Sequence, residues 1–191
     1  MTTVIKNVFS QDEILTLHRL LSSYAGEGNK IENTGRYIIS TTMFEMFPGM
    51  KDIITKIETY ASNTINKKMK MFISAFHLYK MSYGIPSLKP HIDEAAGEVV
   101  FDYQLDSSLS WPIKVNKKIY ELNNNDALIF AGETVAHGRT QQVFNGNDYV
   151  LMFIVNLISD EHWANFHEQN PKDIELIKKE IFDIREDKEN W

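Results

Sequence analysis

The sequence contains no cysteine. This absence excludes disulfides, thiolate zinc sites, iron–sulfur clusters and cysteine nucleophiles together. A metal ion in this protein must therefore be bound by nitrogen and oxygen atoms. The chain also has no surplus of positive charge, because 20 basic and 26 acidic residues give a formal net charge of −6. A net negative charge gives no strong signal of nucleic-acid binding.

Long apolar runs are absent as well. The longest run, residues 150–155, has six residues, whereas a helix that spans a bilayer needs roughly 20. The first residues lack the charged region and the apolar region of a signal peptide. We therefore expect a soluble, cytoplasmic protein with no membrane segment. The sequence also lacks a phosphate-binding loop and a nucleophile elbow.

The residues that are present can form a core, since the 191-residue chain is 43% hydrophobic and 24% charged. The pattern of the first third is mainly helical. Ser10 and Glu13 fit a capping box before apolar residues at helical spacing, and a second amphipathic helix is predicted over residues 53–65. A short strand is predicted between them, over residues 37–43. Pro171 suits the first turn of a C-terminal helix.

The middle of the chain changes to short strands. They are predicted over residues 69–81, 98–105, 112–115, 118–122, 127–130, 135–143 and 149–158. The pairs Asn116-Lys117 and Asn145-Gly146 are typical of tight hairpin turns. The longest strands are apolar on both faces, which indicates cover on both sides. We therefore expect a mainly β fold with flanking α, with a barrel or jelly roll over about residues 70–158 in a single domain of residues 1–191.

Three polar side chains in this region suit a metal ion. In an extended chain residues i and i+2 point to the same side, so His91 and Asp93 can present an imidazole and a carboxylate to one point. His137 could add a third ligand if its strand lies beside theirs. Two histidines and one carboxylate leave the opposite face of the metal open, as in the facial triad of non-haem Fe(II) oxygenases. The spacing alone is a weak signal, because a lone histidine is more often a hydrogen-bonded core or surface residue.

Two longer stretches carry a family resemblance. Residues 78–93 contain a tyrosine, a glycine and then Pro90-His91-Ile92-Asp93, and they resemble the entry to the active site of 2-oxoglutarate- and Fe(II)-dependent dioxygenases of the prolyl-hydroxylase-like branch. Residues 125–137 resemble that family's turn, short strand and distal histidine. Here the turn reads Asn-Asn-Asp, where family members usually have Pro-Gly-Asp. The similarity covers roughly residues 70–158.

The resemblance has implications for fold and chemistry. It implies a double-stranded β-helix, a jelly-roll or cupin-like barrel, supported by the N-terminal helices and the C-terminal helix. It also implies that His91, Asp93 and His137 bind Fe(II), with 2-oxoglutarate and O₂ as cosubstrates. In this family, oxidative decarboxylation of 2-oxoglutarate drives the reaction, so we expect hydroxylation of a C–H bond in a peptidyl or small-molecule substrate.

The binding site for 2-oxoglutarate is where this chain departs from the family pattern. Family members hold the distal carboxylate with an arginine or lysine, commonly on the strand after the distal histidine, but residues 149–158 contain no basic residue. Arg139, two residues after His137, is expected to face the same side as that histidine. Its planar fork suits a carboxylate. The alternative role for Arg139 is an ion pair with Asp126 or Glu133.

Other residues near the expected cavity have weaker assignments. Lys114 is a second candidate for the 2-oxoglutarate carboxylate if its side chain points inward. Tyr79 could donate its hydroxyl to the same carboxylate or could simply pack against its neighbours. His77 shares the face of Tyr79 and could line the pocket, although we interpret it as a satisfied buried histidine. Trp111 and Trp163 are interpreted as packing residues.

Two other functions stay open on the sequence. A cupin-like metal enzyme could use the same three ligands for zinc and a bound water, without 2-oxoglutarate. A non-catalytic jelly-roll binding protein would use its histidines for packing. His162 and His167 are five residues apart, which is not the spacing of a helical metal pair, so we interpret them as structural or surface residues. The substrate and the oligomeric state are not specified by the sequence.

Overall fold

The computed structural model describes residues 1–24, 28–31, 34–41, 47–93 and 97–165. Its helices are α1 (Gln11–Ser23), α2 (Met50–Ile65) and α3 (Asp160–Asn165). Its strands are β1 (Thr2–Ile5), β2 (Asn29–Ile31), β3 (Arg36–Thr41), β4 (Lys70–Tyr79), β5 (Leu88–His91), β6 (Val99–Ser107), β7 (Ile113–Val115), β8 (Lys118–Tyr120), β9 (Ala127–Phe130), β10 (His137–Arg139) and β11 (Val150–Ile158). The C-terminal helix predicted after Pro171 lies outside the described residues.

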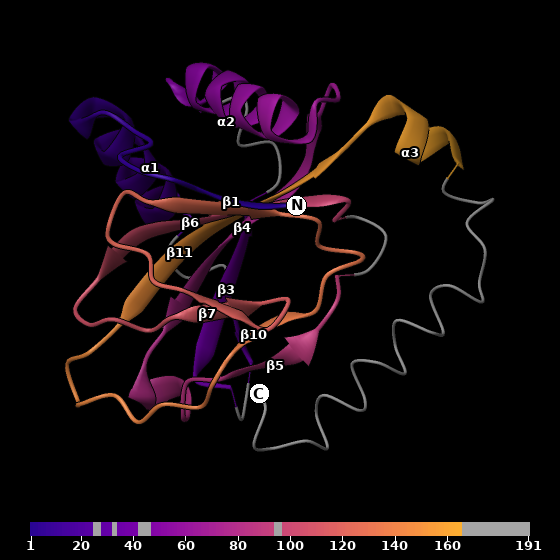
Figure 1. Ribbon diagram of the computed structural model, residues 1–191. Coiled ribbons are helices and arrows are strands. Elements are labelled where there is room, and N and C mark those ends of the chain that lie inside the picture. The colour runs from indigo at the N-terminus through magenta and orange to yellow at the C-terminus, as the bar shows by residue number, and fades with distance from the viewer. Residues whose placement is uncertain (25–27, 32–33, 42–46, 94–96, 166–191) are drawn as a thin grey trace.

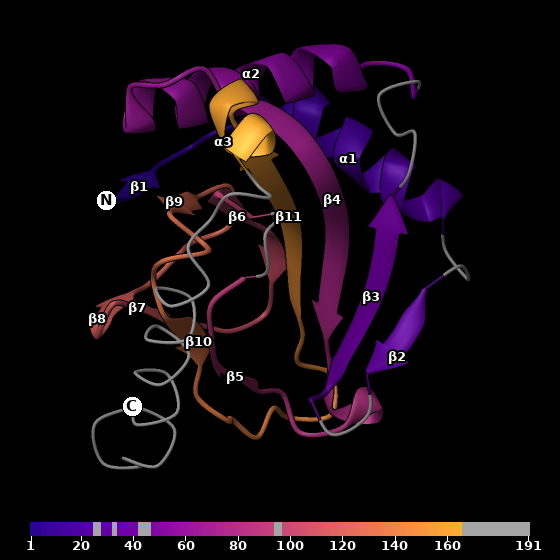
Figure 2. The same ribbon diagram turned by 90° about the vertical axis from the view of Figure 1, so that its right-hand side faces the viewer.

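The strands form two antiparallel sheets. The larger sheet has seven strands in the order β1-β9-β6-β11-β4-β3-β2, and the smaller has four in the order β5-β10-β7-β8. Figure 1 shows α1 and α2 on one side of the larger sheet and β5, β7 and β10 on its other side. Figure 2 shows the same layers after a quarter turn. This arrangement is the expected double-stranded β-helix with supporting helices.

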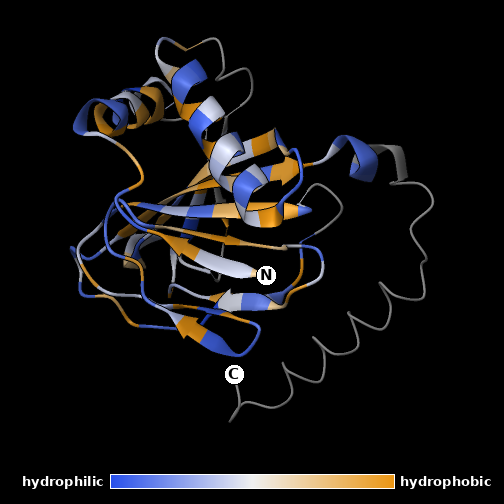
Figure 3. Ribbon diagram, turned by 45° about the horizontal axis from the view of Figure 1, so that its top comes forward, coloured by the Kyte–Doolittle hydropathy of each residue, from blue (hydrophilic) through white to orange (hydrophobic). Residues whose placement is uncertain are grey.

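The larger sheet lies between two hydrophobic cores. Phe101 on β6 belongs to the core that the sheet forms with the helices, together with Leu17 of α1 and Ile57 of α2. Its neighbour Val100 belongs to a second core between the two sheets, together with Trp111. Successive residues of a strand point to opposite faces, so both faces of the sheet are apolar, as the sequence predicts. Figure 3 shows hydrophobic and hydrophilic residues alternating along the helices, as amphipathic helices require.

Two local signals in the sequence are confirmed. The Ser10 side chain accepts a hydrogen bond from the Glu13 amide (3.3 Å), and the Glu13 carboxylate accepts one from the Ser10 amide (2.7 Å), which completes the capping box of α1. Asn116 and Lys117 both have positive φ, 47° and 63°. Positive φ at both central residues is what a type I′ turn requires, and this turn joins β7 to β8.

The prediction from Asn145-Gly146 is only partly correct. A turn is present, because the Asp148 amide donates to the Asn145 carbonyl at 2.9 Å. The flanking strands β10 and β11 belong to different sheets, however, so the turn lies in a crossing loop and does not close a hairpin. The strand predicted over residues 135–143 is also shorter, since β10 covers three residues.

The first third contains strands that the sequence pattern missed. β1 pairs with β9 at one edge of the larger sheet, and β2 pairs with β3 at its other edge. β3 itself corresponds to the strand predicted over residues 37–43. β1 and β2 have four and three residues, which is too short for a two-residue period to stand out. Within the described residues, none of the helices combines the length and the hydropathy needed to cross a membrane.

Candidate metal centre

His91, Asp93 and His137 come together at one edge of the smaller sheet. His137 of β10 is directly opposite His91 of β5, and their ring centroids are 4.3 Å apart. Asp93 follows β5, and its Oδ1 lies 3.6 Å from His91 Nε2 and 3.7 Å from His137 Nε2. The three ligand atoms all lie within 4.8 Å of one another, and no other such group of three or more occurs within the part of the chain that the structure describes. The expected juxtaposition of the three side chains is therefore present.

Hydrogen bonds to the backbone orient both imidazoles. His91 Nδ1 lies 2.8 Å from the Lys89 carbonyl oxygen, and His137 Nδ1 lies 3.0 Å from the Val135 carbonyl oxygen. A carbonyl oxygen only accepts, so each Nδ1 must carry the proton that is donated. Each Nε2 then keeps its lone pair for a metal ion, in the arrangement by which metal-binding histidines are usually oriented.

Two glycines allow the Asp93 carboxylate to reach this position. The Asp93 amide donates to the Gly132 carbonyl at 2.9 Å. A Cβ atom on Gly132 would overlap the Asp93 carboxylate and would lie 2.6 Å from the Gly97 carbonyl oxygen. A Cβ atom on Gly97 would lie 2.9 Å from the Asp93 Cβ. Both positions therefore require glycine because of close approach, and the sequence analysis singled out neither.

Burial and neighbouring charges set the protonation of the triad. Burial, with the nearby His91 acting in the same direction, lowers the pKa of His137 to about 4. Burial would raise the pKa of Asp93, but hydrogen bonding with His91 and the charge of His137 outweigh it, so the net shift is downward. At neutral pH the triad therefore offers a carboxylate with a neutral His137, which suits a divalent cation.

A cavity between the two sheets adjoins the triad. Its apolar wall comes from the core between the sheets and consists of Leu88, Val100, Ile113, Phe130, Met152 and Ile154. Its other polar residues are Arg36, His77, Tyr79, Asp102 and Arg139. His77 therefore faces the cavity from β4. Burial lowers the pKa of His77 to about 3, and the charge of Arg36 acts in the same direction, so its imidazole is neutral at pH 7.

Arg139 lines this cavity but is already engaged. It is 3% exposed, and its Nη2 lies 3.2 Å from Asp102 Oδ2. Its Nη1 donates to the Trp111 carbonyl, and the guanidinium carbon lies 5.2 Å from the centroid of the Trp111 ring. The alternative role of an ion pair is thus present, with Asp102 as the partner in place of Asp126 or Glu133. The sequence analysis did not identify Asp102.

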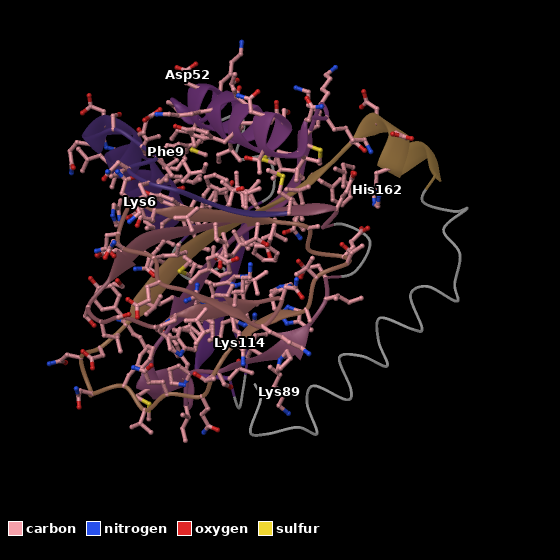
Figure 4. The ribbon with its side chains drawn as sticks, viewed as in Figure 1. Lys6, Phe9, Asp52, Lys89, Lys114 and His162 are labelled. Atoms are coloured by element: carbon pink, nitrogen blue, oxygen red, sulfur yellow. The ribbon has the colours of Figure 1, made fainter. Side chains whose placement is uncertain are left out.

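The structure separates the other two candidates for the 2-oxoglutarate carboxylate. Tyr79 is buried, lines the cavity, and packs edge-on against Trp111 with ring centroids 4.7 Å apart. Lys114 on β7 is not among the residues that line the cavity, whereas its neighbour Ile113 is. Adjacent residues of a strand point to opposite faces, and Figure 4 labels Lys114 on the smaller-sheet side of the molecule. Trp111 donates its indole N–H to the Thr140 carbonyl at 2.9 Å, which agrees with a packing role.

Arg36 is a second cavity residue, besides Asp102, that the sequence analysis missed. It is the first residue of β3 and lies opposite Tyr79 of β4. The predicted strand began at residue 37, so this arginine was left outside it. The available signal was a single basic residue at the start of a short apolar strand. Its Nε atom is buried and has no hydrogen-bond partner.

His162 also has a defined role. It lies on α3 (Figure 4), and its Nε2 is 3.0 Å from Glu133 Oε1, while its Nδ1 is 3.8 Å from Glu98 Oε2. It therefore links α3 to the barrel, in agreement with the structural interpretation. His167 and the Trp163 side chain lie outside the described part of the chain.

Comparison of the sequence with family models and with curated proteins gives no match. Comparison of the fold with solved structures gives many. The non-haem α-ketoglutarate-dependent epimerase SnoN from nogalamycin biosynthesis matches with a TM-score of 0.68 and 10% identity, over 83% of this chain and 78% of that chain. A prolyl hydroxylase from Trichoplax adhaerens, in complex with a hypoxia-inducible-factor peptide fragment, matches with a TM-score of 0.65 and 13% identity. This match covers 85% of this chain and 86% of that chain.

A third neighbour carries both a metal and the cosubstrate. HygX from Streptomyces hygroscopicus, with nickel and 2-oxoglutarate bound, matches with a TM-score of 0.63 and 9% identity, over 83% of each chain. Identities this low establish a shared architecture and leave the chemistry to be argued from the residues. The chain therefore has the double-stranded β-helix fold of the 2-oxoglutarate- and Fe(II)-dependent oxygenases.

Proposed function

We propose that this protein is a non-haem Fe(II)- and 2-oxoglutarate-dependent dioxygenase that hydroxylates a C–H bond of a peptidyl or small-molecule substrate. His91, Asp93 and His137 would hold the iron. The observation that carries the proposal is the convergence of their three ligand atoms within 4.8 Å, beside a cavity between the sheets. Two imidazoles and one carboxylate on one side are the donor set that leaves open positions for exogenous ligands.

The bound group would supply the redox chemistry, in which the substrate C–H bond, O₂ and 2-oxoglutarate are converted to the hydroxylated product, succinate and CO₂. The protein's own part is to fix the ligands and the charge. The triad contributes one negative charge to a divalent cation, so the site keeps a net positive charge that attracts an anionic cosubstrate. The carbonyls of Lys89 and Val135 hold the two rings in place, so that both Nε2 atoms would be available to the metal ion.

The cavity wall favours oxidation over side reactions with solvent. Val100, Ile113 and Phe130 line it and are at most 3% exposed. Phe130 also packs against the His137 ring, with centroids 4.6 Å apart. An apolar wall of this kind keeps water away from a reactive centre.

Two classes of substrate fit the proposal. One structural neighbour is a prolyl hydroxylase in complex with a peptide fragment, and another, the epimerase SnoN, is in complex with Fe³⁺, α-ketoglutarate and nogalamycin RO. We therefore retain both a peptidyl and a small-molecule substrate. We also retain the cytoplasm as the expected location, since a chain without cysteine needs no oxidising compartment to form disulfides.

A second candidate function is a cupin-like metal enzyme that does not use 2-oxoglutarate. Two observations favour it. β11 has no basic residue, and the nearest arginine to the distal histidine, Arg139, is paired with Asp102 at 3.2 Å. In that case zinc with a bound water would serve hydrolysis or isomerisation.

An anaerobic titration with Fe(II) and then 2-oxoglutarate tests the proposal. We expect a metal-to-ligand absorption band in the wild-type protein and its loss in His91→Ala, Asp93→Ala and His137→Ala. His18→Ala, on α1, is the matched control and should retain the band. A wild-type protein that binds the metal but shows no band with 2-oxoglutarate would favour the second candidate, and a band that persists in all three variants would refute the ligand assignment.

A further inference from the structure

Among the described residues that line the cavity, and outside the triad, the positive charges outnumber the negative ones. Two arginines line it there, Arg36 and Arg139, but only one carboxylate, that of Asp102. Asp102 pairs with Arg139 at 3.2 Å. Among the described residues no carboxylate forms an ion pair with Arg36, whose Nε atom is buried and without a hydrogen-bond partner. A buried cationic donor without an acceptor is costly, so the cavity is built to receive an anion at Arg36.

The strand register places Arg36 beside Tyr79, whose hydroxyl is the only one among the described residues that line the cavity. Arg36 of β3 lies directly opposite Tyr79 of β4, and a hydrogen bond links the two side chains. Tyr79 is itself fixed against Trp111, with ring centroids 4.7 Å apart and planes at 69°. The guanidinium therefore has a fixed neighbour, and its buried Nε–H has no acceptor among the described residues. An incoming carboxylate could accept from Arg36 and from the Tyr79 hydroxyl together.

Arg139 is a poorer receptor for the same group. Its guanidinium already donates to Asp102 and to the Trp111 carbonyl. A second carboxylate at Arg139 would lie next to the buried Asp102 charge, and two like charges at close range repel strongly in a low dielectric. Displacing Asp102 would leave that carboxylate buried and unpaired.

We propose that Arg36, together with Tyr79, binds the far carboxylate of a 2-oxo dicarboxylate whose other end chelates the metal, while Arg139 serves to hold Asp102. This inference rests on the proposed function. β4 has two neighbours in the larger sheet, β11 and β3. The residues that pair with Tyr79 are Val150 on β11 and Arg36 on β3. The basic residue that β11 lacks is thus supplied from the other side of β4.

The shape of the Arg36 guanidinium would determine which 2-oxo acids the site prefers. The guanidinium fork matches a carboxylate in a bidentate geometry that neither a methyl group nor water reproduces. Arg36 would therefore select 2-oxo acids with a second carboxylate over those with an alkyl end. 2-Oxobutyrate is the diagnostic probe, because it retains the chelating carboxylate and keto group of 2-oxoglutarate but lacks the far carboxylate.

The test compares the binding of both probes to the Fe(II)-loaded protein under anaerobic conditions, followed by the metal-to-ligand absorption. Loss of charge-assisted hydrogen bonds costs roughly a tenfold to a hundredfold in affinity. Arg36→Gln should weaken 2-oxoglutarate by that factor and leave 2-oxobutyrate unchanged. Arg139→Lys keeps a cation beside Asp102 and should change neither probe strongly. Arg19→Gln, on the exposed side of α1, is the matched arginine control.

The outcomes separate this inference from the proposed function. If the wild type binds both probes and Arg36→Gln binds 2-oxoglutarate as tightly as the wild type, or loses both probes equally, the assignment of Arg36 is wrong while the proposed function stands. If the metal-loaded wild type binds neither probe, the proposed function fails and this inference fails with it. Should Arg36→Gln not fold, as judged by its thermal unfolding, Arg36→Lys retains the charge without the fork and should show a smaller loss for 2-oxoglutarate alone.

Discussion

At the scale of single residues, the geometry of the candidate metal centre depends on two glycines as much as on its three proposed ligands. Gly132 and Gly97 leave room for the Asp93 carboxylate between them. A side chain at either position would push that carboxylate away from the two imidazoles, although neither glycine would contact a metal ion itself. Residues that orient ligands in this way typically change metal affinity by ten- to a hundredfold when they are replaced.

We predict that Gly132→Ala weakens binding of Mn²⁺ or Fe²⁺ by at least about tenfold. The new Cβ would lie 2.6 Å from both the Gly97 carbonyl oxygen and Val100 Cγ2, and it would overlap the Asp93 carboxylate. Because backbone lies on one side, the strain cannot be relieved by rotating a flexible side chain. Calorimetric titration with the metal measures the effect.

Gly146→Ala supplies the control for this prediction. A Cβ at Gly146 would meet nothing within 4 Å, so metal affinity should stay at the wild-type value. Equal affinities for Gly132→Ala and Gly146→Ala would mean that Asp93 is not a ligand or that the loop adapts without cost.

At this scale, the juxtaposition of the triad could be predicted from chemistry and local spacing, whereas its role as a metal site stays a prediction. The i, i+2 spacing and the family motif identified His91, Asp93 and His137, and the structure brings all three together. Arg36 and Asp102 were missed for a different reason. Arg36 lies opposite Tyr79 only because β3 pairs with β4 in one particular register. The residue pattern of either strand alone does not specify that register. Such a contact between side chains depends on which strands are neighbours in the folded sheet.

At the scale of elements, the confirmed predictions concern structures that a few consecutive residues determine. The capping box needs only residues 10–13, and the β7–β8 turn needs only two residues of positive φ. The edge strands β1 and β2 have no such local cause, because they are formed by pairing with β9 and β3. The ends of helices and strands could therefore be predicted where they are fixed by hydrogen bonds between residues a few positions apart.

The β7–β8 turn leads to a stability prediction. Lys117 has a φ of 63°, in the left-handed region where a side chain costs about 1 kcal/mol or more. Glycine removes that cost but makes the unfolded chain more flexible. The net effect of Lys117→Gly should be a stabilisation of roughly 0.5 kcal/mol, measured as a higher midpoint of urea unfolding at an unchanged slope.

Lys118→Gly tests whether that gain comes from the turn. Lys118 begins β8, and its φ is not positive. Glycine there gains no relief of strain and weakens a strand, so this variant should be less stable than the wild type. A loss of stability in both variants would contradict the turn assignment.

At the scale of the whole molecule, the larger sheet is the shared wall of two cores. Its outer face packs on α1 and α2, and its inner face lines the cavity that adjoins the triad. The apolar pattern predicted cover on both faces but could not say which layer covers which face. That choice depends on pairings between distant segments, such as His137 with His91 across 46 positions of chain. The cavity is a property of the two assembled sheets and has no separate signal in the sequence.

One carboxylate joins three parts of this assembly. Glu98, just before β6, accepts from the Ser159 amide at 2.7 Å and from the Ser159 hydroxyl at 2.8 Å, where β11 passes into α3. It also pairs with Lys67, just after α2, at 3.2 Å. Burial would raise the pKa of the Glu98 carboxyl, but the Ser159 hydrogen bonds and the Lys67 ammonium outweigh it and lower that pKa below its ordinary value.

The lowered pKa of Glu98 predicts a pH-dependent stability. A carboxyl whose pKa is lower in the folded protein stabilises the fold above its ordinary pKa of about 4.5, and this contribution is lost as the pH falls through the folded value. Glu98→Gln should therefore lower the free energy of unfolding at pH 7 by about 1–2 kcal/mol, since hydrogen bonds to a charged acceptor are lost. The deficit should shrink between pH 5 and pH 3, as the wild-type carboxyl takes up its proton. Urea unfolding at pH 7, 5 and 3 measures it, with the exposed Glu121→Gln as control. A deficit that stays constant across this range would show that Glu98 acts through packing and not through its charge.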